Sequence, residues 1–339
     1  MADPFNPYAT LYENPRGAGD QRPTALQIVQ DNERIGTLTD KVVLITGGTG
    51  GMGIEIARAL YATGAQIYIT ARDLEKAKSV CENIEGKGIG KKVEVIEVDL
   101  ESLDSVKAAA VEFQKRCQKL NILINNAAIM CPPESASKDG FELQFAINHL
   151  AHFTLTTLLL PNMIASSTED FNSRVIFVSS SCHRYSTVHF DNINLKGEYQ
   201  THIAYGQSKT AMIWTANNID RFYSSKGVHA LSINPGGVWT DLQKFAPPAA
   251  VEQAKKNEQI MNDMQSPEQG AATAVWAAIG NVWEGKGGKY LASCKVGGLA
   301  ENLVHPHSDG YAPWAYDEEG ERKLWDLSLE LTGVTARDV

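Results

Sequence analysis

A tyrosine and a lysine four residues apart are the side chains whose types and spacing suggest chemistry most directly. Tyr205 and Lys209 fall in a stretch of helical length, and their spacing places them on one face of a helix. A free tyrosine has a pKa near ~10 and is a poor acid or base at neutral pH. A nearby ammonium and a positive nicotinamide ring would lower that pKa, so the phenol could exchange a proton with a substrate oxygen during hydride transfer. The alternative for such a pair is a buried tyrosine and a surface lysine.

A glycine-rich turn lies between a predicted strand and a predicted helix. The strand at residues 42–46 runs into the sequence GGTGGMG at 47–53, and a helical pattern follows. Glycines let the backbone turn sharply and approach a pyrophosphate, and the helix N-terminus offers unpaired N–H groups. This context predicts a dinucleotide site, and the alternative is a glycine-rich connection without a ligand.

The end of the second predicted strand bears on the type of dinucleotide. The strand at 66–70 is followed by Ala71 and Arg72, where an acidic residue would bond the ribose hydroxyls of NAD and repel a 2′-phosphate. A guanidinium suits a phosphate, so NADP(H) is favoured. The alternative is that Arg72 is a surface charge paired with Asp73 or Glu75.

A run of serines ends another predicted strand. The sequence RVIFVSSSC places Ser179, Ser180 and Ser181 at the carboxyl end of a parallel strand, where ligands bind in open α/β sheets. A hydroxyl at this place can bond and orient a substrate oxygen. The neighbouring Cys182 has no identifiable general base, so it is interpreted as a packed thiol rather than a nucleophile.

The elements that must position these groups alternate between strands and helices. Helical stretches begin near residues 52, 102, 141 and 205. Apolar, β-branched runs of strand length lie between them, at 41–46, 65–70, 92–98, 121–126, 174–180, 228–234 and near 288–293. This alternation predicts an α/β fold, a single Rossmann-like doubly wound parallel sheet of about seven strands with helices on both faces.

The remaining segments are assigned around that sheet. Residues 1–40 are predicted as an irregular, mobile N-terminal arm with a short helix at 24–34 capped by Thr24. Residues 41–300 are predicted to form the NADP-binding catalytic domain, with a substrate loop at about 240–266 and a helix at 267–279. Residues 301–339 are predicted as a C-terminal extension packed on the same domain.

Composition excludes several classes of partner. The 339 residues have a formal net charge of -9, which argues against broad binding to nucleic acid or anionic membranes. The five cysteines are widely spaced and form no C-x-x-C pair, which suits free thiols in a reducing compartment and indicates no zinc site. No apolar run approaches the ~20 residues of a membrane span, and no signal peptide is visible. A cytoplasmic protein without a metal is expected.

In chain order, the motifs resemble those of the short-chain dehydrogenase/reductase superfamily from about residue 41 to 290. The nearest resemblance is to its retinol dehydrogenase and WW-domain oxidoreductase-like branch, and the N-terminal stretch looks like that of fungal members, many of which act in natural-product pathways. The motifs are TGGTGGMG (46–53), VDL (98–100), NNAA (125–128), QFAINHLAHF (144–153), VSSS (178–181), YGQSK (205–209) and NPGGVWT (234–240).

This resemblance implies site residues. The catalytic positions fall on Asn148, Ser180, Tyr205 and Lys209, with Asn148 holding a water in a proton relay to Lys209. Ser180 is preferred to the two flanking serines by alignment with the family motif. The resemblance implies cofactor contacts from Tyr205 and Lys209 and from Gly47, Thr49, Gly51, Met52, Gly53, Arg72, Asp99, Leu100, Asn125, Ala127, Pro235, Gly236, Val238 and Thr240.

The expected activity is reduction of a medium-to-large apolar ketone or aldehyde by NADPH. The alternatives are oxidation of a secondary alcohol on a steroid, retinoid or polyketide, and a catalytically silent NADP(H)-binding sensor or scaffold. An apolar substrate pocket is expected to include Trp239, Phe245, Met261 and Met264. A homodimer formed through the helices near residues 102 and 141 is expected from the resemblance.

Overall fold

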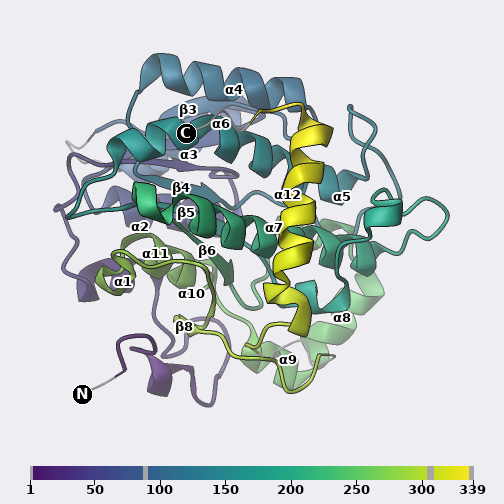
Figure 1. Ribbon diagram of the computed structural model, residues 1–339. Coiled ribbons are helices and arrows are strands. Elements are labelled where there is room, and N and C mark those ends of the chain that lie inside the picture. The colour runs from purple at the N-terminus through teal and green to yellow at the C-terminus, as the bar shows by residue number, and fades with distance from the viewer. Residues whose placement is uncertain (1–2, 87–90, 304–308, 336–339) are drawn as a thin grey trace.

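Eight strands form one sheet in the computed structural model, which describes residues 3–86, 91–303 and 309–335 (Figure 1). Their order across the sheet is β3-β2-β1-β4-β5-β6-β7-β8, and all neighbours are parallel except β7 and β8. The strands are β1 (Val42–Ile45), β2 (Gln66–Ala71), β3 (Glu94–Glu97), β4 (Ile122–Asn125), β5 (Ser173–Val178), β6 (Val228–Asn234), β7 (Lys289–Ala292) and β8 (Lys295–Val296). The predicted Rossmann-like α/β fold is confirmed.

The eighth strand is absent from the sequence prediction. It has two residues and pairs back onto β7 through a tight turn at Ser293 and Cys294, both with a φ of 50°. Two residues show no alternation of apolar and polar side chains, and neither turn residue is a glycine, so no sequence signal marks this hairpin.

The side chains of each strand alternate between two hydrophobic cores. In β1, Val43 and Ile45 face one core while Val42 and Leu44 face the other. The first core is covered by α1 (Ala25–Asp31), α2 (Gly51–Tyr61), α3 (Leu74–Glu85), α10 (Pro267–Gly270) and α11 (Ala272–Ile279). The second is covered by α4 (Leu103–Arg116), α6 (Ala151–Ser166), α7 (Thr201–Tyr223) and α12 (Glu318–Thr332), and Figure 1 shows the yellow α12 lying beside α7. The sheet is therefore buried on both faces.

Three helix boundaries differ from the sequence prediction or refine it. Helix α7 begins at Thr201 instead of Tyr205, after the extended residue Gln200, so Tyr205 lies in the second turn. The helix predicted at 267–279 is divided at Ala271 into α10 and α11. Helix α1 begins after Thr24, whose hydroxyl accepts a hydrogen bond from the Gln27 N–H as a capping residue does.

A π-helical turn lies in the element that carries Asn148. The short α5 (Leu143–Phe145) continues into a π-helical turn at Ala146–Leu150 and then into α6. Such turns are rare in proteins as a whole, and those that occur often lie at functional sites.

The segment between β6 and α10 is largely helical. It contains a 3-10 turn at Asp241–Phe245, α8 (Pro248–Lys256) and α9 (Glu258–Asp263). The N-terminal arm packs against its end, where the Gly17 N–H donates to the Asn262 carbonyl at 2.9 Å and Arg22 donates to the carbonyls of Asp263 and Met264 at 2.8 and 2.7 Å. These contacts join the arm to residues 262–264. Within the described residues, no helix is both long and apolar enough to cross a membrane.

Candidate active site

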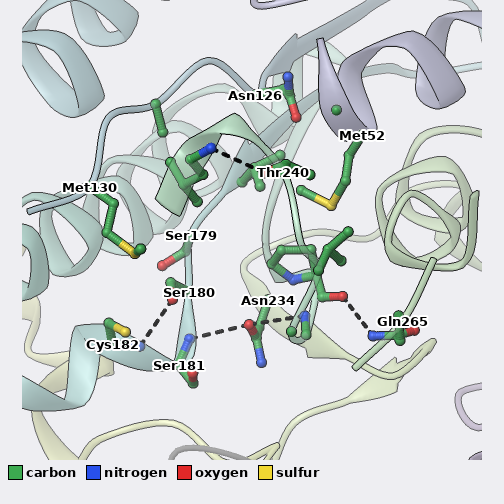
Figure 2. A pocket seen from close by; sticks show the side chains of 18 of the residues that line it. Met52, Asn126, Met130, Ser179, Ser180, Ser181, Cys182, Asn234, Thr240 and Gln265 are labelled. Carbon is green, nitrogen blue, oxygen red and sulfur yellow. Dashed lines mark hydrogen bonds between the residues drawn. The ribbon is translucent and has the colours of Figure 1, made fainter. Parts of the chain in front are cut away.

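A cavity of about 850 Å³ lies where β1, β4, β5 and β6 end (Figure 2). This edge of a doubly wound sheet is where ligands bind, on either side of the point at which the strand order reverses. The cavity brings together predicted site residues from five segments that are far apart in the chain: Gly47, Thr49, Gly51, Met52, Gly53, Ala127, Ser180, Tyr205, Lys209, Pro235, Gly236, Val238 and Thr240.

The glycine turn forms a backbone cradle at one end of this cavity. A Cβ atom on Gly53 would lie 2.1 Å from the Gly47 carbonyl oxygen, and one on Gly47 would lie 2.9 Å from the Ala127 Cα. Gly47 also has a φ of +67°, which favours glycine. Helix α2 begins directly after Gly50 and has no side-chain cap at its N-terminus. The turn therefore has the close packing and the uncapped helix end that fit the pyrophosphate of a dinucleotide.

Ser180, Tyr205 and Lys209 meet at the other side of the cavity. The Tyr205 side chain is buried, and it borders the cavity together with Ser180. The Lys209 amine lies 5.5 Å from the centroid of the Tyr205 ring and donates to the Val178 carbonyl at 2.7 Å. The Tyr205 ring and the Lys209 amine therefore lie next to each other at this side of the cavity.

Burial changes the pKa of both groups. It raises the pKa of the Tyr205 phenol well above its usual value, and the Ser180 side chain opposes that shift. Burial also lowers the pKa of Lys209 to about 7. The sequence predicted that the ammonium would lower the tyrosine pKa, but in the protein alone desolvation has the larger effect.

The three serines that follow β5 have different partners. The Ser179 hydroxyl donates to the Lys209 carbonyl at 2.9 Å, so it is directed into the packing between β5 and α7. The Ser181 N–H donates to Asn234 at 3.2 Å (Figure 2). The Ser180 hydroxyl accepts from the Cys182 N–H at 3.1 Å, and Ser180 is the serine whose side chain lowers the pKa of Tyr205. Burial raises the pKa of the neighbouring Cys182 thiol, which disfavours a nucleophilic thiolate.

Asn148 is fully buried beside the cavity wall and does not line the cavity. Its side-chain oxygen accepts from the Ile129 N–H at 2.9 Å, and its side-chain nitrogen donates to the Ile129 carbonyl and to the Ser208 hydroxyl, both at 3.0 Å. These bonds connect the π-helical turn to the segment after β4 and to α7, the helix of Tyr205 and Lys209. Asn148 thereby braces the walls of the site.

The predicted cofactor residues near β2 and β3 lie outside the cavity. Arg72 directly follows β2 with 71% of its side chain exposed, and it contacts Glu101 at 3.5 Å instead of Asp73 or Glu75. The Asp99 carboxylate accepts from Lys138 at 2.6 Å, and Leu100 packs against the second core. Asn125 is buried and donates to the Thr156 hydroxyl at 2.9 Å.

The cavity also has walls that sequence reasoning missed. Asn126 and Met130 follow β4, and the rule that polar residues at strand ends face ligands could have found Asn126 as well as Asn125. The N-terminal arm contributes Tyr12, and the β7–β8 hairpin contributes Lys295. Nothing in the local sequence of the arm or hairpin indicates this position.

The aromatic and methionine residues expected in a substrate pocket are placed differently. Trp239, Phe245, Met261 and Met264 do not border the cavity. Met264 lies beneath Gly237, where an added Cβ would be 2.7 Å from its sulfur, and Lys255 lies over the Trp239 ring. The same segment borders the cavity through Leu242 and Lys244 instead.

The mostly parallel sheet, the glycine cradle and the cluster of Ser180, Tyr205 and Lys209 are typical of α/β oxidoreductases that bind a dinucleotide. The chain belongs to the short-chain dehydrogenase/reductase family, because the family model described as short chain dehydrogenase matches residues 41–250. This confirms the family predicted from the motifs.

Several curated proteins are similar over nearly the whole chain. The short-chain dehydrogenase/reductase prx1 of Penicillium rubens is 48% identical over 328 residues, which cover 97% of this chain and 95% of that protein. The oxidoreductase calI of Penicillium decumbens is 42% identical over 98% of this chain and 99% of that protein. Human polyprenol dehydrogenase is 32% identical over 87% of this chain and 86% of that protein.

A solved structure with the same fold is that of Pseudomonas aeruginosa RhlG in an active-site complex with NADP. It is 23% identical, covers 76% of this chain and 96% of its own chain, and has a TM-score of 0.61. At this identity the similarity concerns the fold.

Proposed function

We propose that this protein is an NADP(H)-dependent oxidoreductase that transfers hydride between the nicotinamide and a carbonyl or secondary-alcohol carbon. Its substrate is a medium-to-large apolar compound, and the direction is reductive, within natural-product biosynthesis. The observation that carries this proposal is the meeting of Ser180, Tyr205 and Lys209 in one cavity with the glycine turn.

The residues of the chain perform the acid–base part of this reaction. The bound cofactor supplies the hydride that the carbonyl carbon accepts. Ser180 donates a hydrogen bond to the carbonyl oxygen and orients it, while Tyr205 gives its proton to the same oxygen as the C–O double bond becomes single. Lys209, in its charged form, stabilises the phenolate that remains. The products are the alcohol and the oxidised cofactor, so a hydride and a proton have been added.

The preference for NADP(H) rests on Arg72. It directly follows β2 and has an exposed side chain, and no carboxylate occupies the first position after that strand. The contact of its guanidinium with Glu101, at 3.5 Å, is weak, so the guanidinium can bind the 2′-phosphate of NADP(H) instead. We expect Arg72→Ala to raise the Michaelis constant for NADPH about tenfold or more and to leave that for NADH unchanged. An equal change for both cofactors would refute this role.

Support for a large apolar substrate comes from the cavity and from the relatives. Ile129, Met130, Leu242 and Tyr12 provide apolar surface at its walls. A curated relative is named for its action on polyprenol, a long apolar alcohol. The similarity to fungal proteins supports a role in fungal metabolism.

We also propose that the protein acts in the cytoplasm as a homodimer that pairs through α4 and α6. All five cysteines are free, which suits a reducing compartment. Val111 of α4 has an exposed fraction of 49% and would lie on the surface that pairs. Sedimentation of the wild-type protein and of Val111→Glu tests the pairing, and a monomeric wild type would contradict it.

The decisive experiment measures NADPH consumption with a panel of ketones and aldehydes. We expect Tyr205→Phe to lower kcat by about a thousandfold while NADPH still binds, because only the proton donor is removed. Tyr199→Phe is the matched control, since the Tyr199 hydroxyl bonds the Pro132 carbonyl outside the cavity. Full turnover by Tyr205→Phe would refute the proposal, as would a wild type that consumes NADPH with none of the panel.

A further inference from the structure

His152 lies between the glycine turn and the π-helical turn and bonds both. Its Nδ1 is 3.0 Å from the backbone carbonyl of Asn148, and its Nε2 is 2.9 Å from the Thr46 hydroxyl. The side chain is fully buried and does not border the cavity. Its role is therefore not explained by contact with a cofactor or substrate.

The hydrogen-bond partners determine which nitrogen of His152 carries the proton. A carbonyl oxygen only accepts, so Nδ1 must be protonated and donate to Asn148. Nε2 is then an acceptor, and the Thr46 hydroxyl donates to it. The other oxygen within reach of that hydroxyl, the Ile124 carbonyl, is more distant at 3.4 Å. Burial lowers the pKa of His152 to about 4, which agrees with a neutral ring.

The donor and acceptor positions of the Thr46 hydroxyl are thereby all occupied by hydrogen bonds. Its single proton goes to His152, and its oxygen accepts from the N–H groups of Asn126 and Ala127 at 2.9 and 3.0 Å. Asn126 in turn donates to the Thr46 carbonyl at 2.9 Å. The end of β1, where the glycine turn starts, is thus bonded to the segment after β4 and, through His152, to the π-helical turn.

The opposite end of the network reaches the catalytic helix. Asn148 donates to the Ser208 hydroxyl at 3.0 Å, and Ser208 donates to the Tyr205 carbonyl at 2.8 Å. A continuous series of buried bonds therefore runs from the glycine turn through Thr46, His152 and Asn148 to Tyr205. Each of these hydrogen bonds is buried, and a fully satisfied buried network of this kind makes the structure rigid.

We propose that His152 is a positioning residue that fixes the distance between the cofactor turn and the catalytic pair Tyr205 and Lys209. This inference rests on the proposed function, since hydride and proton transfer require the cofactor turn and the catalytic pair to lie at the correct distance from each other. A misplacement of about 1 Å at such a site can lower the rate about a hundredfold. Loss of His152 should therefore affect kcat more than stability alone explains.

The chain offers a matched control in His149. This histidine lies three residues earlier, is equally buried, and bonds Ser328 of α12 at 2.8 Å, on the side away from the site. His149→Leu removes a buried imidazole within the π-helical turn, and His152→Leu removes one in the first turn of α6 that follows it. Both should lower Tm, but only His152→Leu should lower kcat, by about tenfold or more, because a buried hydroxyl and a buried carbonyl lose their partner.

Substitution by glutamine tests the hydrogen bonds rather than the ring. A glutamine amide is uncharged and presents one donor and one acceptor, so His152→Gln can bond both Asn148 and Thr46. We expect its kcat to stay within about threefold of wild type. His152→Asn is too short to reach both partners and should give an intermediate rate, which keeps the test valid if His152→Leu does not fold.

The experiment combines kcat, Tm and amide hydrogen exchange of residues 122–130 for these variants. Exchange there should accelerate about tenfold in His152→Leu and stay unchanged in His149→Leu, and this readout needs no substrate. The inference would be overturned if folded His152→Leu had the kcat and the hydrogen exchange of the wild type. If only His152→Asn folds, the same result in that variant would overturn it. So would an equal loss of kcat in His149→Leu. A wild type without activity would instead count against the proposed function, and the exchange measurement would still decide the role of His152.

Discussion

The amine of Lys209 lies over the ring of Tyr205, 5.5 Å from its centroid. The amine donates to the Val178 carbonyl at 2.7 Å. It is buried, and among the described residues no carboxylate pairs with it, so desolvation lowers its pKa to about 7. Several consequences of this arrangement can be measured.

The first prediction concerns the cost of burying Lys209. The pKa of Lys209 is about 7 in the folded protein and 10.5 in the unfolded chain. Burial of the amine therefore lowers the free energy of unfolding by its full amount below pH 7, and this loss disappears as pH rises from 7 to 10.5. Lys209→Met should abolish turnover yet raise the free energy of unfolding at pH 6 by about 2–5 kcal/mol. Urea unfolding at pH 6 and pH 10 measures this. The exposed Lys226→Met is the control, and a gain that does not shrink at the higher pH would contradict the explanation.

The second prediction concerns the pH dependence of catalysis. The Lys209 ammonium is lost as pH rises through about 7, and the neutral amine stabilises neither an anionic cofactor nor a phenolate. We expect kcat/KM for NADPH-driven reduction to decline above that pH, since this ratio reports groups of the free enzyme. Initial rates between pH 5.5 and 9 provide the profile. A flat profile up to pH 9 would show that the charge of Lys209 is not required.

Much of the fold follows from local patterns in the sequence. The strands β1, β5 and β6 are runs of β-branched and apolar residues that are buried on both faces, which is the pattern of a parallel sheet. The glycine turn was identifiable because Gly47 and Gly53 occupy places where a Cβ would collide with backbone. Tyr205 and Lys209 were identifiable because helical spacing alone puts them together.

Other parts depend on contacts between distant residues. Arg22 donates to carbonyls about 240 residues further along the chain, so the ordered arm has no local signature. The helix start at Tyr205 was wrong because Thr201 to Ala204 contain no residue that prevents an earlier start. The burial that raises the pKa of Tyr205 in the protein alone depends on packing that the sequence does not display.

The third prediction separates two glycines of the turn. Gly53→Ala should lower Tm by several degrees, because its Cβ would lie 2.1 Å from the Gly47 carbonyl oxygen. Gly50→Ala should leave Tm unchanged, because no atom lies within 4 Å of its added Cβ. Both substitutions should weaken NADPH binding if the open space beside Gly50 receives the pyrophosphate. Calorimetry of unfolding and of NADPH binding distinguishes these effects, and unaltered binding by Gly50→Ala would place the pyrophosphate elsewhere.

The fourth prediction concerns acid stability. Burial lowers the pKa of His149 to about 3 and of His152 and His183 to about 4. Their unfolded forms take up protons below pH 6.5, so the stability present above that pH is lost as pH falls toward 4. Each histidine should reduce the free energy of unfolding by about 2 kcal/mol at pH 5. Urea titrations at pH 7 and pH 5 test this, and His149→Gln should lose less stability than wild type over that interval.

The fifth prediction concerns the arm as a wall of the substrate cavity. Tyr12 borders the cavity and lies 3.5 Å from the Cys294 sulfur, while its neighbour Leu11 packs on the core and does not reach the cavity. Tyr12→Ala should therefore raise kcat/KM for bulky ketones relative to small ones by about tenfold, because the removed ring leaves room at the wall. Leu11→Ala should change stability without changing that ratio. If both variants rank the ketones as wild type does, the arm encloses the cavity without selecting its substrate, and selection must then come from the residues around Met130 and Leu242.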